Sequence, residues 1–244
     1  HHPLREYAPV EALIGVLAGD GIGPEVTAEA VRILQAVGSC HGHQFGFRAG
    51  LIGGAAIDAT GSAFPTATRQ LCADADAVLL GAVGGPRWSS PDAPVRPEQG
   101  LLDMRAAMGV YANLRPVVTH PLLYDSSPLK AERLFGVDIL VIRELTGGIY
   151  FGRKERTATS ATDVCTYSRQ EIERVLRMAG QLAMQRRRKV TSVDKANVLE
   201  TSRLWRSIAT ELFTGEFPQL QVEHLLVDAA AMHLLSRAAD FDVI

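Results

Sequence analysis

Short apolar runs alternate with stretches of helical period along most of the chain. Runs that are apolar enough for buried strands cover residues 13–18, 77–83, 137–142, 190–193 and 222–227. Helical spacing is found between them, at residues 24–37 and 199–213, and Gly38 is predicted to end the first of these helices. Strands that alternate with helices predict an α/β fold.

The helices are predicted from their apolar stripes and their ends. In the first helix the stripe consists of Val26, Ala30, Ile33, Leu34 and Val37. Residues 168–189 give the clearest pattern, with Ser168 and Glu171 as a capping box. The buried stripe of that helix is predicted to be Ile172, Val175, Leu176, Ala179 and Ala183. The basic run 186–189 falls at its C-terminal end, where cations complement the helix dipole, so we interpret it as a solvated helix end.

Three segments stand apart from this alternation. Residues 88–99 are rich in proline, and residues 152–167 are rich in Thr and Ser without a helical or strand period. Loops of this length inside a compact domain tend to be functional. The last four residues, 241–244, have the pattern of a buried strand that has just begun, with no turn after them. We interpret that ending as a truncation.

Composition removes several classes of function. Apolar residues make up 47% of the chain and the net charge is −2, so no basic excess favours nucleic-acid binding. The three cysteines are scattered and form no CxxC pair, which argues against a zinc site or a disulfide framework and fits a reduced cytoplasm. No run of about 18 apolar residues predicts a membrane span.

The glycine-rich turn Gly19-Asp20-Gly21-Ile22-Gly23 does not predict a Rossmann dinucleotide site. Asp20 and Glu25 would place negative charge where a pyrophosphate needs free amides, and Pro24 removes one of the donors. The spacing is GxGxG and not GxGxxG. A purely structural turn is the competing interpretation.

Polar residues follow several of the predicted strands. Arg143 comes directly after residues 137–142, Lys195 follows 190–193 beside Asp194, and Asp228 follows 222–227. In an open α/β sheet, ligands bind outside the carboxyl ends of the strands. These three side chains are therefore candidates for one binding site.

Arginines at element boundaries point to a carboxylate ligand. Arg105 and Arg115 join Arg143, and several guanidinium forks in one pocket would suit a dicarboxylate. Taken singly, each arginine is more simply a surface or salt-bridged residue. Tyr150 is either a core residue or a proton donor, and Asp228 alone cannot hold Mg²⁺, which takes several oxygen ligands.

At these residues the chain closely resembles the 3-isopropylmalate dehydrogenases of the β-decarboxylating dehydrogenase family, from about residue 14 to residue 244. The resemblance rests on six motifs: Gly19-Asp20-Gly21-Ile22-Gly23-Pro24-Glu25, Gly84-Gly85-Pro86, Asn113-Leu114-Arg115-Pro116, the run from Arg143 to Gly152, Asp194-Lys195-Ala196-Asn197-Val198-Leu199 and Val227-Asp228-Ala229-Ala230-Ala231-Met232.

The resemblance implies a two-domain α/β fold of the isopropylmalate and isocitrate dehydrogenase type, not a Rossmann fold. Residues 1–109 would be the N-terminal part of the first, cofactor-side domain. Residues 110–244 would be the second domain, for dimerisation and substrate binding, with an intersubunit arm at about 152–167. The first domain would be incomplete and the second cut at its end, so we expect the 244-residue chain itself to be inactive.

The implied reaction is the oxidative decarboxylation of 3-isopropylmalate to 4-methyl-2-oxopentanoate, with reduction of NAD and with Mg²⁺ or Mn²⁺. It belongs to leucine biosynthesis, in the cytoplasm, in a homodimer whose subunits share active sites. No nucleic acid or membrane partner is expected. The alternatives are a relative that acts on homoisocitrate or tartrate, and an inactive fragment.

The resemblance also implies roles for individual residues. Catalysis would fall to Tyr150, which protonates the enol, and to Lys195, which removes the hydroxyl proton. Substrate carboxylates would be held by Arg105, Arg115 and Arg143, while Asp228 would bind the metal ion and touch the substrate hydroxyl. The residues expected along the nicotinamide half of NAD are Gly85, Pro86, Arg87, Glu98 and Asn197.

An apolar wall is expected to accept the isopropyl group. It would consist of Leu101, Leu102 and Val198. The competing interpretation is that the two leucines simply begin a core helix.

Overall fold

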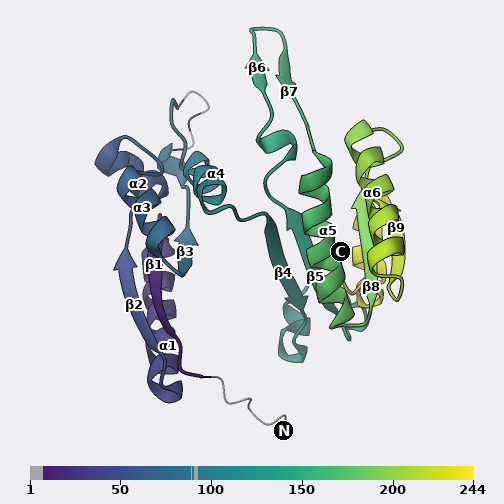
Figure 1. Cartoon of the computed structure of the whole chain (residues 1–244), viewed down its shortest axis with the longest axis horizontal. Coiled ribbons are helices and arrows are strands. Elements are labelled where there is room, and N and C mark those ends of the chain that lie inside the picture. Colours follow the sequence, from purple (N-terminus) through teal and green to yellow (C-terminus); the bar gives the residue numbers. More distant parts are fainter. Residues whose placement is uncertain (1–7, 89, 91–92) are drawn as a thin grey trace. The chain divides into compact units, whose positions relative to one another are not determined.

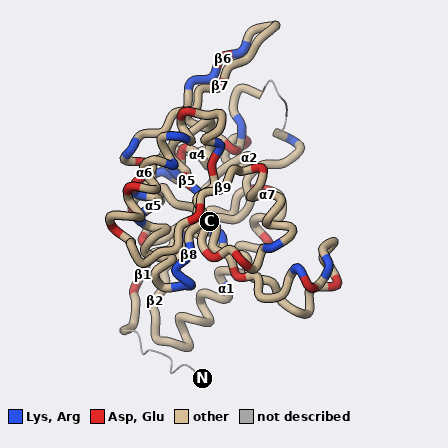
Figure 2. Tube along the Cα trace, turned by 90° about the vertical axis from the view of Figure 1, so that its right-hand side faces the viewer, with Lys and Arg blue, Asp and Glu red and all other residues tan. Residues whose placement is uncertain are grey.

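The computed structural model describes residues 8–88, 90 and 93–244. The chain divides into two compact units, His1–Gly109 and Val110–Ile244, each with its own sheet and core (Figure 1). In the part of the chain that is described, no helix is long and apolar enough to cross a membrane. Basic and acidic residues are interspersed along both units (Figure 2).

Unit 1 is built on a parallel sheet in the order β2-β1-β3, with strands β1 (Glu11–Gly19), β2 (Gln44–Ala49) and β3 (Ala77–Ala82). Its helices are α1 (Gly23–His41), α2 (Gly53–Thr60), α3 (Thr66–Asp74) and α4 (Pro97–Met108), with a 3-10 turn η1 (Pro86–Trp88). The core consists of Leu17, Ile52, Phe64, Leu71, Cys72 and Met104. Strand–helix alternation is therefore confirmed in this unit.

Two predictions about α1 are wrong. The helix runs through Gly38 to His41 and ends at Gly42, whose φ of 73° suits a left-handed cap. The predicted apolar stripe is largely exposed, with Val26 at 49% and Ile33 at 65%, and the buried face carries Thr27 instead. Small residues face the sheet because the backbones approach closely: a Cβ on Gly23 would lie 2.0 Å from the Ala18 carbonyl oxygen.

Unit 2 contains an antiparallel pair, β4 (Ala112–Val118) and β5 (Asp138–Glu144), and a parallel pair, β8 (Lys189–Asp194) and β9 (Gln221–Leu226). Its helices are α5 (Arg169–Met184), α6 (Glu200–Glu216) and α7 (Val227–Ser236). Short 3-10 helices occur at η2 (Pro121–Ser126), η3 (Ala131–Arg133), η4 (Gly148–Tyr150) and η5 (Ala238–Asp240). The core is lined by α5 and α6 residues such as Ile172, Leu176, Ile208 and Phe213.

Residues 241–244 join the two strand pairs of unit 2 into one sheet. Val243 forms parallel bridges with both Leu140 of β5 and Val190 of β8. The Leu140 amide donates to the Asp242 carbonyl oxygen at 2.8 Å, and the Thr191 amide donates to that of Val243 at 2.8 Å. Phe241 and Val243 are both 0% exposed, which confirms the predicted buried strand at this segment.

The basic run 186–189 is not the solvated helix end that its sequence suggested. Helix α5 ends at Met184, and two arginines behind it hold the 241–244 segment. Arg186 bonds the buried Asp242 carboxylate with its Nε at 2.8 Å and the Asp138 carboxylate with its Nη2 at 2.7 Å. Arg187 donates to the carbonyl oxygens of Ala239 and Phe241. The partners of these two arginines are carboxylates and carbonyl oxygens that lie near them only in the folded unit, so the run could not be recognised as structural from the sequence.

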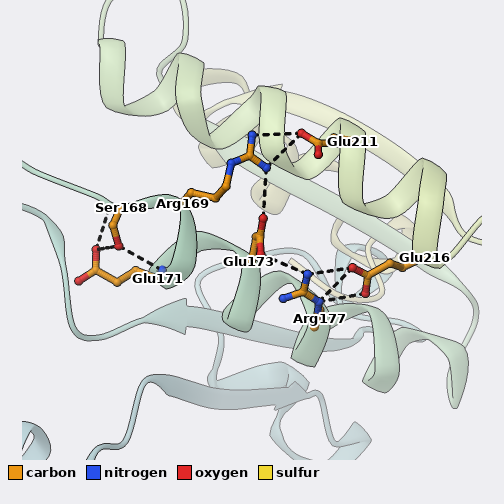
Figure 3. Close-up of polar contacts among 7 residues, drawn as sticks. All are labelled: Ser168, Arg169, Glu171, Glu173, Arg177, Glu211 and Glu216. Atoms are coloured by element: carbon orange, nitrogen blue, oxygen red, sulfur yellow. Dashed lines mark hydrogen bonds and ion pairs between the residues drawn. The ribbon is translucent and has the colours of Figure 1, made fainter.

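Helices α5 and α6 are held together by packing and by ion pairs (Figure 3). The capping box at Ser168 and Glu171 is present, and the predicted apolar stripe of α5 is buried, so both predictions are confirmed. Arg169 bridges Glu173 and Glu211, each at 3.1 Å. Arg177 forks onto Glu216 with two N–O distances of 3.0 Å from its Nε.

Residues 152–167, predicted to be irregular, contain a hairpin of β6 (Lys154–Arg156) and β7 (Ala161–Asp163). In Figure 1 this hairpin extends well away from the remainder of unit 2. Both of its strands are exposed on both faces, so the sequence shows no alternation of apolar and polar residues. Arg153 precedes the hairpin, and Lys154 and Arg156 lie in β6.

Candidate active site

The strand ends of unit 2 bring several candidate residues to one edge of the sheet. Strands β5, β8 and β9 and the 241–244 segment all run parallel, so their carboxyl ends share an edge. Arg143 lies near the end of β5, and Lys195 follows β8 directly. Asp228 does not end a strand as predicted, because β9 stops at Leu226 and Asp228 lies in the first turn of α7.

The register of β4 and β5 creates a polar surface on one face of the sheet. Asn113 lies opposite Arg143 and Arg115 lies opposite Val141, so all three polar side chains share a face. Arg115 donates from Nε to the Asn113 amide oxygen at 2.6 Å. The Arg143 guanidinium lies 5.2 Å from the centre of the Tyr150 ring. We call Asn113, Arg115, Arg143 and Tyr150 the arginine face.

The arginine face is open to an anionic ligand. Its side chains lie at exposed or half-buried positions, and neither arginine forms an ion pair with another described residue. Tyr150 is 55% exposed, which excludes the core interpretation for its side chain. Two guanidiniums on neighbouring strands can each take one carboxylate by a two-point contact.

A buried carboxylate shapes the turn between Arg143 and Tyr150. Glu144, 8% exposed, accepts the amides of Thr146 at 2.8 Å and Gly147 at 2.9 Å, and also the Thr146 hydroxyl. Arg174 of α5 lies 3.9 Å from Glu144 and donates to the Thr146 hydroxyl oxygen. This turn leads into η4, at whose end Tyr150 stands. Sequence reasoning missed Glu144 and Arg174, although an acid next to a candidate arginine was a usable signal.

A second group contains Lys195 and Asp228. The Lys195 ammonium forms a short ion pair with the Asp228 carboxylate, whose side chain is 65% exposed. The hydrogen bond from Lys195 lowers the pKa of Asp228 below its ordinary value. Asn197 and Val198 lie exposed in the turn that follows. No hydrogen bond or ion pair between described residues joins this pair to the arginine face.

The chemistry of the donors decides whether a metal ion fits at Asp228. Among the described residues, no group of three His, Cys, Asp or Glu side chains is arranged to hold a metal ion. At this position they supply one carboxylate, which Lys195 already pairs. A hard divalent cation takes about six oxygen ligands. The described residues therefore do not form a metal site by themselves.

In unit 1 the glycine-rich turn serves the fold. The Asp20 carboxylate, 3% exposed, accepts the amides of Gly54 at 2.8 Å, Ala55 at 2.7 Å and Gly84 at 2.7 Å. It thereby ties β1 to the start of α2 and to the segment after β3. The Asp20 carboxylate is thus hydrogen-bonded to three backbone amides. Its negative charge lies where a pyrophosphate would otherwise bind, so the turn does not form a pyrophosphate site.

The segment that follows β3 carries the residues expected beside NAD. Gly84 has a φ of 100°, and Glu98, exposed in the first turn of α4, approaches it so closely that a Cβ on Gly84 would lie 2.8 Å from its Oε1. Gly85 packs near the Trp88 ring, and Pro86 begins η1. Arg87 pairs with Asp58 at 3.0 Å. The segment is held in place, with the Glu98 carboxylate beside it.

Helix α4 carries the remaining candidates of unit 1. Leu101 packs against the core cluster that includes Phe64 and Met104, so it stabilises the unit. Leu102 is half-buried outside that cluster, and Arg105 lies in the last turn of the helix. One residue of the expected apolar wall, Leu101, therefore also packs against the core of unit 1.

Residues 13–244 match the family model described as "Isocitrate/isopropylmalate dehydrogenase". Among solved structures, the chain is similar to isocitrate dehydrogenase from Methylococcus capsulatus, with a TM-score of 0.80, 27% identity, and 95% of this chain and 65% of that chain covered. A β-decarboxylating dehydrogenase from Thermococcus kodakarensis gives a TM-score of 0.70 at 30% identity, over 95% of this chain and 63% of that one. The chain belongs to the isocitrate/isopropylmalate dehydrogenase family, and the predicted family fold is confirmed.

Within that family, its curated relatives include proteins named 3-isopropylmalate dehydrogenase. The protein from Anaeromyxobacter dehalogenans is 55% identical over 240 residues, which is 96% of this chain and 68% of the relative. That from Geobacillus kaustophilus is 54% identical over 236 residues, 95% of this chain and 63% of the relative. The chain thus spans about two thirds of the length of these relatives.

Proposed function

We propose that this protein takes part in the oxidative decarboxylation of 3-isopropylmalate to 4-methyl-2-oxopentanoate, with reduction of NAD. The observation that carries the proposal is the arginine face, in which the β4–β5 register places Arg115 and Arg143 together and Arg143 against Tyr150. Identities of 54% and 55% with 3-isopropylmalate dehydrogenases support the choice of substrate.

In the proposed reaction, Arg115 and Arg143 hold the malate carboxylates, and the family resemblance assigns a carboxylate contact to Arg105 as well. NAD⁺, when bound, would supply the acceptor for the hydride that leaves C2 of the substrate. Lys195 accepts the hydroxyl proton, which gives a β-keto acid. Only the neutral amine of Lys195 has the free electron pair that this proton transfer needs.

Loss of CO₂ from C3 leaves an enolate, and the Tyr150 hydroxyl returns a proton to C3. The exposure of Tyr150 leaves its hydroxyl accessible to a ligand on the arginine face. The family resemblance assigns Gly85, Pro86, Arg87, Glu98 and Asn197 to the binding of NAD. Glu98 offers the carboxylate that suits a cationic nicotinamide.

Mg²⁺ or Mn²⁺ is proposed from the resemblance, with Asp228 as one ligand. Since the described residues supply a single carboxylate there, no step above is assigned to the ion. A homodimer is proposed as well. It is supported by the projecting β6–β7 hairpin, because an isolated pair of short strands is marginal in water and gains from pairing with a second copy. The setting in leucine biosynthesis and the cytoplasm rests on the resemblance alone.

The proposal is tested by following NADH absorbance with 3-isopropylmalate, Mg²⁺ and NAD⁺, using protein expressed at the length that its own gene encodes. Arg143→Lys keeps the charge but loses the two-point fork, so kcat/KM should fall. A protein that reduces NAD⁺ with isocitrate or tartrate, and not with 3-isopropylmalate, would contradict the assignment of substrate.

Leu102→Asn separates 3-isopropylmalate from more polar malates. Leu102, unlike Leu101, lies outside the core cluster, so its replacement tests the apolar wall without opening the core of unit 1. Loss of a methylene-sized apolar contact changes kcat/KM by roughly tenfold or more. We expect kcat/KM to fall by this factor for 3-isopropylmalate and to change less for malate. Equal changes for both substrates would remove Leu102 from the specificity site.

A further inference from the structure

The strand end beside Lys195 carries an ion pair that the proposed reaction does not use, between a buried carboxylate and a partly exposed guanidinium. Asp194 is the last residue of β8, and its side chain is 2% exposed. Arg206 of α6 bonds both of its oxygens, from Nε to Oδ2 at 2.8 Å and from Nη2 to Oδ1 at 2.9 Å. A carboxylate held by such a fork has a single orientation.

This carboxylate is bonded in turn to the backbone around Lys195. The Ala196 amide donates to Asp194 Oδ1 at 2.9 Å, and the Lys195 amide donates to the Ser202 hydroxyl oxygen of α6 at 3.0 Å. The Lys195 carbonyl oxygen accepts the amides of Val198 and Leu199, both at 2.9 Å. The backbone of Lys195 is thus fixed to β8, to α6 and to its own turn.

Stability alone does not require this pair. Taking the Asp194 carboxylate out of water costs free energy, and an apolar side chain can fill such a buried position as well or better. A lysine amine, on the other hand, stands on a flexible four-carbon stem, so a fixed backbone is the main means of placing it.

We propose that Asp194 and Arg206 are positioning residues for Lys195. They hold its backbone so that the amine stands at the carboxyl edge of the sheet, next to Asp228. The inference rests on the proposed function, in which Lys195 accepts the hydroxyl proton of the substrate. Neither Asp194 nor Arg206 touches the substrate in this scheme.

Two substitutions disturb the pair in different ways, in the protein expressed at the length that its gene encodes. Arg206→Lys keeps the charge and loses the fork, whereas Asp194→Asn keeps an acceptor for the Ala196 amide and loses the charge. Arg177→Lys is the matched control, because Arg177 makes the same kind of fork, from α5 to Glu216 of α6. Circular dichroism and thermal unfolding report whether each variant is folded.

Arg206→Lys should lower kcat by about 10²-fold, the effect of misplacing a reacting group by about 1 Å. KM for 3-isopropylmalate should change little, and the control should keep the parent kcat. In a Lys195→Ala background, Arg206→Lys should cause no further loss, because a positioning residue acts only through the residue that it positions. An unchanged kcat in the single variant, or an equal loss in both backgrounds, would overturn the proposal.

A readout without turnover separates this inference from the proposed function. Lysines are labelled with acetic anhydride, and the labelling of Lys195 is compared with that of Lys189, at the other end of β8, by peptide mass spectrometry. Arg206→Lys should raise the ratio, because a loosened turn releases the amine from Asp228, and an unchanged ratio would overturn the positioning role. A parent protein that fails to reduce NAD⁺ with 3-isopropylmalate would refute the function, while the labelling ratio would still decide the positioning.

Discussion

Tyr150 is held in place without being buried. Its ring packs against the Arg143 guanidinium at 5.2 Å, and the Lys154 ammonium donates to the Tyr150 carbonyl oxygen at 2.7 Å. A cation over an aromatic face restrains the ring while the hydroxyl stays accessible. Tyr150 is therefore restrained at both its ring and its backbone, as the proposed role of proton donor requires.

Tyr150→Phe removes only the hydroxyl and leaves a ring for Arg143. If Tyr150 supplies the final proton, kcat should fall roughly 10²–10⁴-fold, the range for a lost general acid. KM for 3-isopropylmalate should stay close to that of the parent. Steady-state kinetics of NADH formation measure both values, and full activity in the variant would assign the tyrosine a structural role.

His224 of β9 should make the stability of unit 2 depend on pH. Burial lowers the pKa of its ring below the ordinary 6.5, with nearby Arg206 acting in the same direction and Asp194 against it. The folded state therefore keeps the ring neutral at pH values where the unfolded chain binds a proton. The contribution is fully present above pH 6.5 and is lost as pH falls towards the lower folded pKa.

His224→Gln removes this titration. Urea unfolding at a series of pH values between about 7.5 and 5 should show a shallower loss of stability in the variant than in the parent. Parallel curves for the two proteins would show that His224 does not contribute to the dependence on pH.

At the scale of elements, two strand–helix connections of unit 2 follow the same plan. Strand β5 ends at Glu144, which meets Arg174 of α5, and strand β8 ends at Asp194, which meets Arg206 of α6. Each acid also accepts backbone amides from the turn that follows it. Arg143 adjoins Glu144 and Lys195 adjoins Asp194. In each connection the carboxylate shapes the turn, and the candidate functional residue lies next to it in the chain.

The capping box of α5 offers a test of how one helix end contributes to stability. The Ser168 hydroxyl oxygen accepts the Glu171 amide at 3.3 Å, and Glu171 bonds back to the Ser168 amide at 2.7 Å. Ser168→Ala should lower the free energy of unfolding by about 1 kcal/mol, as loss of a cap usually does. Ser160→Ala, in the exposed hairpin, is the control, and equal effects of the two changes in urea unfolding would contradict the capping role.

Elements with a long apolar period could be predicted from the sequence, and those set by close contacts could not. The stripe and the cap of α5 were readable because six buried residues repeat at helical spacing. The buried face of α1 could not be predicted in this way. Gly23 and Thr27 are buried because the helix approaches the sheet closely, and not because of their hydropathy. The hairpin β6–β7 has no buried face, so its sequence lacks the alternating apolar pattern that would predict strands.

The same limit applies to the candidate site. Arg143 and Lys195 could be placed at strand ends from the apolar runs before them. That Arg115 stands beside Arg143 depends on the pairing of β4 with β5, and β4 carries too many exposed residues to be recognised as a strand. The buried acids Glu144 and Asp194 look like surface residues until their arginine partners on the next helix are known.

At the scale of the whole molecule, the sheet of unit 2 depends on residues 241–244. Phe241 is 0% exposed and packs with Val137 and Ile139, and Arg187 bonds its carbonyl oxygen. Phe241→Ala should therefore destabilise unit 2 by about 3–5 kcal/mol, the usual cost of emptying a buried aromatic site. Unit 1, which has its own core, should be unaffected.

Tryptophan fluorescence can follow one unit at a time, because Trp88 lies in unit 1 and Trp205 in unit 2. With Trp88→Phe as the background, the urea midpoint reported by Trp205 should fall in Phe241→Ala. Phe151→Ala, at a position that is 40% exposed, should change it little. Equal midpoints for all three proteins would show that the sheet of unit 2 does not need Phe241.

The place of residues 241–244 also matters while the protein is being synthesised. The three described strands of unit 1 have all been made by Ala82, so the nascent chain can pair them early. In unit 2 the amides of Leu140 and Thr191 bond residues 242 and 243, which are translated some 50 residues after Thr191. Both amides lack these acceptors until then. Until then, two strand edges stand open as templates for other chains. The interval in which the ribosome makes residues 195–240 is therefore the period of greatest exposure to wrong strand pairing.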